Sequence, residues 1–292
     1  MRASGILLPV TSLPSEYGIG CFSKEAYEFV DSLKAAGQKY WQILPLGPTG
    51  YGDSPYQSFS TYAGNPYFID LKTLEQEGLL KEEECTACDF GDHPEYVDYE
   101  KIYKSRFLIL EKAFERFVPD EDYAGFIEEN SYWLDDYCLY MAVKKQQKDV
   151  SWSEWPKELK DRVPEVLEAK KEELKKEIEF YRFLQYLFAV QWKKLKAYAN
   201  EQGIEIIGDI PIYVAFDSAD TWAHPELFQF DEENQPLAVA GCPPDAFSAT
   251  GQLWGNPLGL SQEHRICVVD AAPEIRHNAV RCGPDRPLPG IR

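Results

Sequence analysis

The sequence predicts an α/β fold with parallel strands, and three observations support that prediction. Short apolar runs with the length and composition of strands occur at residues 5–10, 40–46 and 204–207. An amphipathic helix is expected between the first two runs, and a long helix-periodic region separates the second from the third. Two strands joined through a helix lie parallel in one sheet, and their crossover is right-handed.

The helix between the first two strands is predicted at residues 23–36. Apolar residues recur at helical spacing from Phe22 to Leu33, and Ser23 is a residue type that favours the N-cap. Gly37 stands where a helix usually ends in a left-handed residue. The first and third strands have the apolar pattern of buried strands.

Residues 50–67 follow the carboxyl end of the second strand and are rich in Gly, Ser, Pro and Tyr. Active sites of parallel sheets are built from loops at this end of the strands. Aromatic rings interleaved with short polar side chains suit a sugar, because a ring covers its C–H face while polar groups bind its hydroxyls. Packing of these tyrosines on the helical region explains the pattern equally well.

Residues 70–200 are helical and strongly charged, and the clearest helix is predicted at 172–200. Its aromatic stripe is typical of a core, and the Lys and Glu run at 169–177 is typical of a solvated face. Gly203 is expected to end the helix. A connection of this length far exceeds an ordinary crossover, so we expect an inserted helical subdomain.

Two features follow the third strand. Asp209 stands at its end, where an acid is either bonded to backbone amides, paired or functional. Further on, Trp254 and Asn256 lie in a Gly- and Pro-rich stretch of the kind that forms a lid over a ligand.

The composition changes after residue 260. Residues 261–292 contain no lysine but five of the ten arginines, and their net charge is +1 against −20 for the preceding residues. We expect this tail to be foreign to the fold, as a reading-frame shift would produce. A genuine Pro/Arg linker is the alternative.

The net charge of −19 disfavours nucleic acid and membrane surfaces as partners. No apolar run approaches the ~18 residues of a membrane span. The seven scattered cysteines argue against a disulfide framework and favour the reducing cytoplasm. The single Cys85–Cys88 pair makes a zinc or redox protein the weakest alternative, and we expect no metal and no cofactor.

Six segments resemble the amylomaltase (4-α-glucanotransferase) family in order and approximate spacing. They are residues 8–14, 41–49, 51–58, 208–214, 223–226 and 251–258. The resemblance covers residues 3 to about 258. It implies a partial (β/α)8 TIM barrel of the α-amylase type, with a large helical insertion after the second strand.

The resemblance also implies four regions. Residues 1–70 would hold the first barrel strands and a sugar-binding loop, and residues 71–200 the inserted subdomain. Residues 201–260 would hold the third barrel strand and the lid, with the foreign tail at 261–292. The implied activity is retaining transfer of α-1,4-glucan segments to a sugar 4-hydroxyl, so α-1,4-glucans and maltooligosaccharides are the expected partners. No oligomeric state follows from the sequence.

Four of the implied substrate-binding residues precede the lid. By the resemblance, Tyr56 would line the subsites beside the scissile bond and Asp209 would hydrogen-bond the glucose there. Tyr51 resembles a ring at a secondary glucan-binding surface, and Ser54 resembles a polar contact near it.

The other three implied residues are Asp245, Trp254 and Asn256, on a mobile loop over the acceptor side. Retaining transfer needs two carboxyl groups about 5–5.5 Å apart. The family's nucleophile lies in an Arg-Ile-Asp-His-Phe-Arg-like segment, and no such segment occurs in 261–292. We therefore expect no catalytic residue in this chain and a truncated, inactive fragment. A non-catalytic α-glucan-binding protein and a hydrolase of the amylase group are the alternatives.

Overall fold

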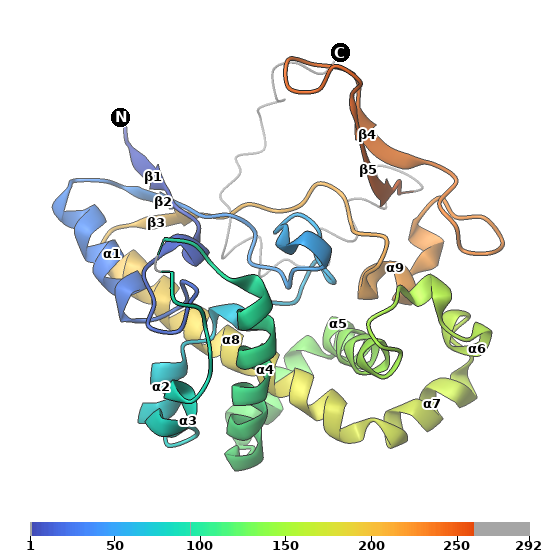
Figure 1. Cartoon of the computed structure of the whole chain (residues 1–292), viewed down its shortest axis with the longest axis horizontal. Helices are drawn as coiled ribbons and strands as arrows, with labels where there is room; N and C mark the ends of the chain where they lie inside the picture. Colours follow the sequence, from blue (N-terminus) through green and yellow to red (C-terminus); the bar gives the residue numbers. More distant parts are fainter. Residues whose placement is uncertain (1, 94, 260–292) are drawn as a thin grey trace.

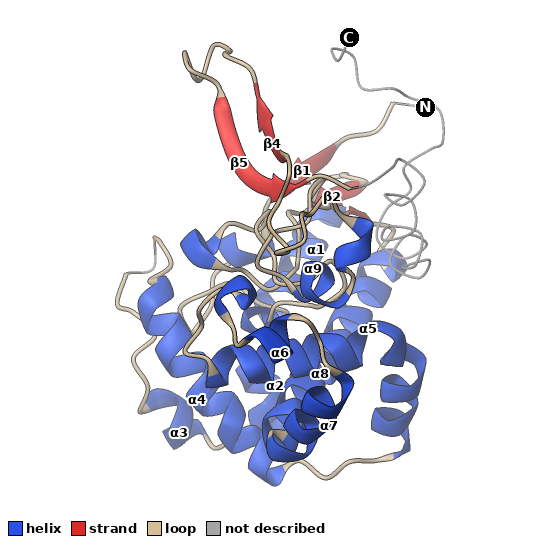
Figure 2. Cartoon of the chain, turned by 90° about the vertical axis from the view of Figure 1, so that its right-hand side faces the viewer, coloured by secondary structure: helices blue, strands red, loops and turns tan. Residues whose placement is uncertain are grey.

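A computed structural model of the chain describes residues 2–93 and 95–259. The described chain is a mixed α/β protein in which helices form the body and the strands gather above them (Figures 1 and 2). No helix in these two ranges is long and apolar enough to cross a membrane. The predicted foreign tail at 261–292 lies outside the described residues.

The central sheet contains three parallel strands, as predicted. They are β1 (Gly5–Leu7), β2 (Tyr40–Gln42) and β3 (Glu205–Ile207), in the order β1-β2-β3. Trp41 pairs with Ile6 on one side and with Ile206 on the other. The strands are shorter than their apolar runs, although the backbone pairing continues past β1 through Leu8, whose N–H donates to the carbonyl of Gln42.

Helix α1 (Lys24–Ala35) covers one face of this sheet. Trp41 is fully buried under it, and the indole N–H donates to the Leu8 carbonyl at 2.8 Å. Ser23 stands at the predicted N-cap, but its hydroxyl bonds the Glu25 carboxylate at 2.6 Å and caps no backbone N–H. Gly37 follows the helix with φ +70°, so the predicted left-handed stop is confirmed.

The opposite face of the sheet is exposed, so the prediction of buried first and third strands is wrong there. Leu7 and Ile207 share one register row with Gln42, and they are 55% and 38% exposed. Ile6, in the row of the buried Trp41, is also 42% exposed. Both outer strands are therefore mostly exposed, while Trp41 of the middle strand is buried. An apolar run alone does not show whether both faces are covered.

Among the described residues, seven helices lie between β2 and β3. They are α2 (Leu71–Gln76), α3 (Glu82–Thr86), α4 (Tyr99–Arg116), α5 (Glu121–Gln146), α6 (Lys157–Lys160), α7 (Pro164–Glu173) and α8 (Lys175–Glu201). Short 3-10 turns are η1 (Val10–Ser12), η2 (Tyr51–Asp53), η3 (Pro66–Phe68), η4 (Trp152–Glu154) and η5 (Pro225–Leu227). The larger core is built mainly by these helices, with α5 packed along α8.

The helix predicted at 172–200 is confirmed as α8, which begins three residues later, at Lys175, and ends at Glu201. Leu174, with φ −104° and ψ 20°, separates α7 from α8. The bend lets Leu167 of α7 and Ile178 of α8 reach the same core, in which Leu174 itself is buried. Gly203, with φ +77°, follows α8 as predicted.

Helix α8 belongs to both cores of the molecule. Its first half places Phe183 and Leu184 in the larger core. Its second half places Leu195 and Ala199 in the smaller core between α1 and the sheet. The sheet is therefore built directly on the last turns of the longest helix.

The chain beyond β3 is anchored to the helical body and then forms a projecting hairpin. The Asp217 carboxylate accepts hydrogen bonds from the Tyr140 hydroxyl at 2.7 Å and from the buried Lys144 ammonium at 2.6 Å. Helix α9 (Ala219–Ala223) follows. The antiparallel strands β4 (Val239–Cys242) and β5 (Gln252–Pro257) then extend away from the helices (Figure 1).

Candidate functional site

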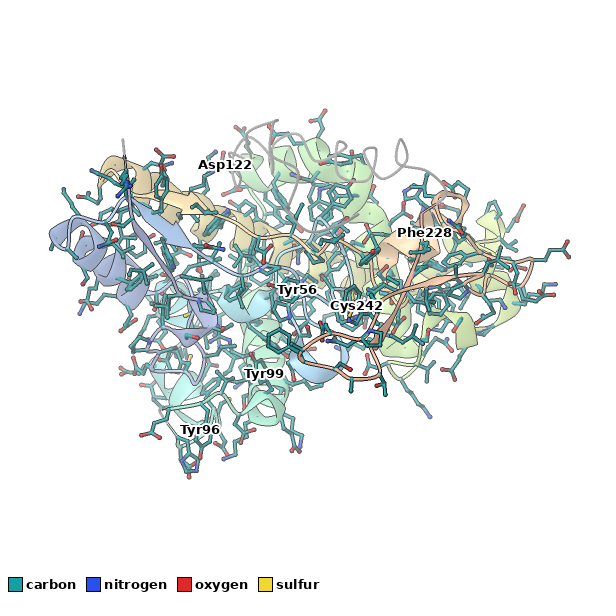
Figure 3. All side chains as sticks on the ribbon, turned by 90° about the horizontal axis from the view of Figure 1, so that it is seen from above. Tyr56, Tyr96, Tyr99, Asp122, Phe228 and Cys242 are labelled. Atoms are coloured by element: carbon teal, nitrogen blue, oxygen red, sulfur yellow. The ribbon has the colours of Figure 1, made fainter. Side chains whose placement is uncertain are left out.

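Tyr56 and Asp209, which the sequence separates by 153 residues, are hydrogen-bonded to each other. The Tyr56 hydroxyl donates to Oδ2 of Asp209 at 2.7 Å, and Oδ1 of Asp209 accepts the N–H of Ile210 at 2.9 Å. The hydrogen bond to the carboxylate raises the pKa of Tyr56, with a smaller contribution from burial. Tyr56 lies near the middle of the molecule seen from above (Figure 3).

Asp209 is half-buried, not buried as its place after an apolar run suggested. One of its oxygens is bonded to a phenol and the other to a backbone amide, and each still has a lone pair for a further donor. A carboxylate held in this way can accept hydrogen bonds from the hydroxyls of a ligand.

The loop that carries Tyr56 is held by its own backbone. The N–H of Gly50 donates to the Gln57 carbonyl at 2.9 Å, and the N–H of Gln57 donates to the Ser54 carbonyl at 3.0 Å. The hydroxyl of Ser54 accepts the N–H of Tyr56 at 3.3 Å. Ser54 therefore shapes the turn that presents the Tyr56 ring.

The far end of the same loop is fixed to helix α8. The Gln185 side chain accepts the N–H of Gly64 at 2.7 Å and donates to its carbonyl at 2.9 Å. A Cβ at position 64 would lie 2.2 Å from the Phe188 ring, so only glycine fits. The helical body thus sets the position of the loop.

Asn256 joins three segments at the base of the hairpin. Its carbonyl accepts from Gln57 at 3.1 Å, and its amide donates to the Val214 carbonyl at 3.2 Å. The side chain is 4% exposed. Asn256 thereby positions β5 against both the Tyr56 loop and the segment that follows Asp209.

Trp254 lies on β5 with 43% of its surface exposed. Its ring contacts that of Tyr213, with centroids 5.9 Å apart, and its indole N–H donates to Gln252 at 3.1 Å. Leu253 beside it is 78% exposed. Successive residues of a strand point to opposite faces, so it is the Trp254 ring that faces Tyr213 of the segment after Asp209.

Asp245 lies at the tip of the hairpin. Its Oδ1 accepts the N–H groups of Phe247 and Ser248, both at 2.8 Å, which ties the carboxylate to its own turn. Phe247 at the same tip is 95% exposed. The structure does not bring Asp245 into contact with the Tyr56–Asp209 pair.

The structure brings some of the predicted site residues together and leaves others apart. Tyr56 and Asp209 touch, and Asn256 joins them through Gln57. Trp254 is linked to the segment after Asp209 through Tyr213. The backbone of Tyr51 lies in η2, but its side chain is outside what the structure describes.

Three groups of the cluster were missed by sequence reasoning: the Gln57 amide, the Tyr213 ring and the Val214 carbonyl. All three belong to the segments quoted for the family resemblance. Their residue types alone gave no signal, because none is charged and none is a catalytic type.

The surroundings of Cys85 and Cys88 give no support to a redox pair. Cys85 is fully buried, and burial raises the pKa of its thiol to about 12; burial also raises the pKa of the Cys88 thiol. A redox thiol requires the opposite shift. No group of three or more His, Cys, Asp or Glu side chains arranged to hold a metal occurs within 2–93 and 95–259.

Comparison with known proteins assigns this arrangement to a family. The sequence profile of the family described as 4-alpha-glucanotransferase matches residues 8–265. A 4-alpha-glucanotransferase of Clostridium butyricum is 54% identical over 252 residues, which are 85% of this chain and 52% of that protein. One of Thermus thermophilus is 50% identical over 263 residues, or 88% of this chain and 52% of that protein.

A solved structure has the same fold over most of the chain. It is the amylomaltase of Streptococcus agalactiae in complex with acarbose, with a TM-score of 0.89 and 42% identity. The match covers 94% of this chain and 58% of that one. The chain therefore spans about half the length of the curated relatives that it matches.

Proposed function

Because this chain belongs to the 4-α-glucanotransferase family, we propose that its Tyr56–Asp209 cluster is one wall of an α-1,4-glucan-binding site. The 2.7 Å hydrogen bond between these two side chains is the observation that carries the proposal. It holds an aromatic ring and an ionised acceptor side by side, which is what a sugar ring with its hydroxyls requires. The acarbose complex of the S. agalactiae relative supports a carbohydrate ligand.

The remaining groups have separate parts in this proposal. Trp254 covers the bound glucan from the hairpin, and Asn256 keeps the hairpin in register with the Tyr56 loop. Asp245 shapes the hairpin tip and reaches the glucan when the hairpin moves. Tyr51 and Ser54 belong to a secondary contact surface at the outer turn of the loop.

The fold of which this wall is a part is, in our proposal, a (β/α)8 barrel. The three parallel strands would be its first three, and α2 to α8 would form the insertion between the second and third. The four regions predicted with boundaries at 70, 200 and 260 stay predictions.

We further propose that these 292 residues bind glucan without transferring it. Retaining transfer needs a carboxylate nucleophile and an acid/base about 5–5.5 Å apart. The Arg-Ile-Asp-His-type segment that would supply the nucleophile is missing from the sequence. Neither nucleic acid nor membrane is proposed as a partner, since the net charge is −19. The cytoplasm is the proposed compartment, because the described cysteines are thiols.

Calorimetric titration of the full chain with maltoheptaose tests the glucan site. We expect binding that Asp209→Asn weakens by about tenfold or more, because hydrogen bonds to a charged acceptor contribute about 1.5–3 kcal/mol. Tyr56→Phe should weaken it less, since the ring is kept. Tyr96→Phe is the matched control, because Tyr96 is also exposed but lies at the rim of the molecule (Figure 3).

The same preparation incubated with maltotriose gives the second readout. Absence of glucose and of longer maltooligosaccharides supports binding without transfer, whereas their appearance refutes it. Equal affinities for the wild type and Asp209→Asn would remove the proposed wall of the site.

A further inference from the structure

A second concave site lies between the end of the Tyr56 loop, helix α5 and helix α9. It is a cleft of about 240 Å³. Three aromatic residues, Tyr62, Tyr132 and Trp133, form much of its lining, and three polar ones face it, Asp136, Asp220 and His224. None of these six residues belongs to the Tyr56–Asp209 cluster.

The Tyr62 ring contacts both of the other aromatic rings. The rings of Tyr62 and Trp133 are nearly parallel, at 14°, with centroids 6.0 Å apart. The Tyr132 ring stands at 89° to that of Tyr62, with centroids 5.8 Å apart. These three rings in mutual contact give the cleft an aromatic lining, on which the apolar face of a pyranose can pack.

The polar groups keep acceptor capacity toward the cleft. Both carboxylate oxygens of Asp220 are bonded by Thr61, through its N–H at 2.9 Å and its hydroxyl at 3.0 Å. Each oxygen retains a lone pair. Nδ1 of His224 lies 3.3 Å from Glu226, which leaves its other ring nitrogen for a ligand.

The charge of the cleft favours a neutral ligand over an organic cation. Asp136 is paired with Arg162, so its charge is compensated. Burial raises the pKa of Asp220 to about 6, so this carboxylate is protonated more readily than an ordinary aspartate. A cage for an ammonium group would instead need uncompensated carboxylates beside the rings.

The size of the cleft limits the ligand to about one ring. Pockets for drug-sized molecules usually have about 300–1,000 Å³, and this cleft is smaller. An extended oligosaccharide could place one residue in it while the rest of the chain stays outside.

We propose that this aromatic cleft is a second carbohydrate-binding site, which takes one glucopyranosyl ring of an α-glucan. The identity of the sugar rests on the glucan-binding function proposed above. That the cleft takes a neutral pyranose is argued from its aromatic lining, its polar groups and its volume. The loop from Gly50 to Gly64 connects the two sites, so a long glucan held in the cleft would stay close to the Tyr56–Asp209 cluster.

Maltose and maltoheptaose titrations of the full chain, by calorimetry and by saturation-transfer NMR, test the proposal. We expect two sites per chain for maltose. Tyr132→Ala should weaken one of them by about fivefold or more, since it removes one of the aromatic rings that line the cleft. Tyr132 is 54% exposed, so this variant should fold, and Tyr96→Ala is its control on another exposed ring.

The variants separate the two sites. Trp133→Ala should remove the same site as Tyr132→Ala, whereas Asp209→Asn should remove only the other. Maltose binding that neither Tyr132→Ala nor Trp133→Ala changes would overturn the cleft proposal and leave the first site standing. Tetramethylammonium bound in the cleft in place of sugar would also overturn it. A wild-type chain that binds no sugar would overturn the proposed function together with the cleft.

Discussion

The helical region between residues 71 and 201 and the strand-bearing remainder differ in how they bury their apolar surface. The helices supply most of a large shared core, in which Phe183, Leu184 and Ile109 are fully buried. The central sheet buries one face under α1 and leaves Leu7 and Ile207 exposed on the other. The hairpin leaves Leu253 exposed as well. Buried apolar side chains are thus concentrated in the helical region, and the Tyr56–Asp209 cluster lies in the other region.

This difference explains how an exposed cluster can have a defined geometry. The Tyr56 loop is pinned at Gly64 by Gln185, which belongs to the helical core. The segment after Asp209 is pinned at Asp217 by Lys144 and Tyr140 of α5. The helices act as the rigid support, and the site is built on two segments that they hold.

The largest effect should come from the helical core. Phe183→Ala is expected to lower the free energy of unfolding by about 3–5 kcal/mol, because it empties a fully buried position packed against Phe117. Urea unfolding followed by circular dichroism measures this. Lys193→Ala, at an exposed position of the same helix, should stay within about 0.5 kcal/mol. A small loss for Phe183→Ala would mean that the core is not the source of stability.

An intermediate effect should come from Asp220, at the boundary of the two regions. Burial raises its pKa from 3.8 to about 6 in the folded chain. The folded state therefore binds the proton more tightly, so the stabilising contribution is complete below pH about 3.8 and is lost as pH rises through about 6. The loss corresponds to roughly 3 kcal/mol.

Asp220→Asn isolates this contribution, because the amide cannot titrate. As the pH rises from 4 to 7, the free energy of unfolding of the wild type should fall relative to that of the variant. The Thr61 N–H still finds an acceptor in the amide carbonyl. If the free energies of unfolding of the two proteins changed in parallel with pH, Asp220 would be ionised throughout this range. Its carboxylate would then be more hydrated than the structure indicates.

The smallest effect should come from the exposed face of the sheet. Leu7→Ala is expected to change the free energy of unfolding by less than about 0.5 kcal/mol, because more than half of the side chain is already exposed. The same urea titration measures it, with Ile6→Ala as a control in the neighbouring row. A cost above about 1.5 kcal/mol for Leu7→Ala would mean that something covers this face in solution, and the contrast between the two regions would fail.

Local patterns predicted the parts of the fold that local physics decides. The spacing from Phe22 to Leu33 predicted α1, and the left-handed stops at Gly37 and Gly203 are confirmed. The parallel pairing followed from the strand–helix–strand order. Burial of the first and third strands did not follow, because an apolar run does not show whether other elements cover the strand. Ile6, Leu7 and Ile207 are all exposed.

Long-range features escaped local reasoning. The bend at Leu174 has no glycine or proline to mark it, and the Lys and Glu run continues across it. The Tyr56–Asp209 pair was expected from the family resemblance, since nothing local links residues 153 apart. Tyr62, Tyr132 and Trp133 gave no signal, because their cleft forms only when the loop meets α5.

Because α8 packs into both hydrophobic cores, the helical region cannot be exchanged between relatives independently of the sheet. A helical region that could be exchanged as a unit would contact the rest of the chain only at its two connections. Here the last turns of α8 are the floor on which the sheet rests, through Leu195 and Ala199. A chimaera that takes this region from a relative must therefore also match Val30 of α1 and Trp41 of β2. Otherwise the sheet will lose its packing against α8.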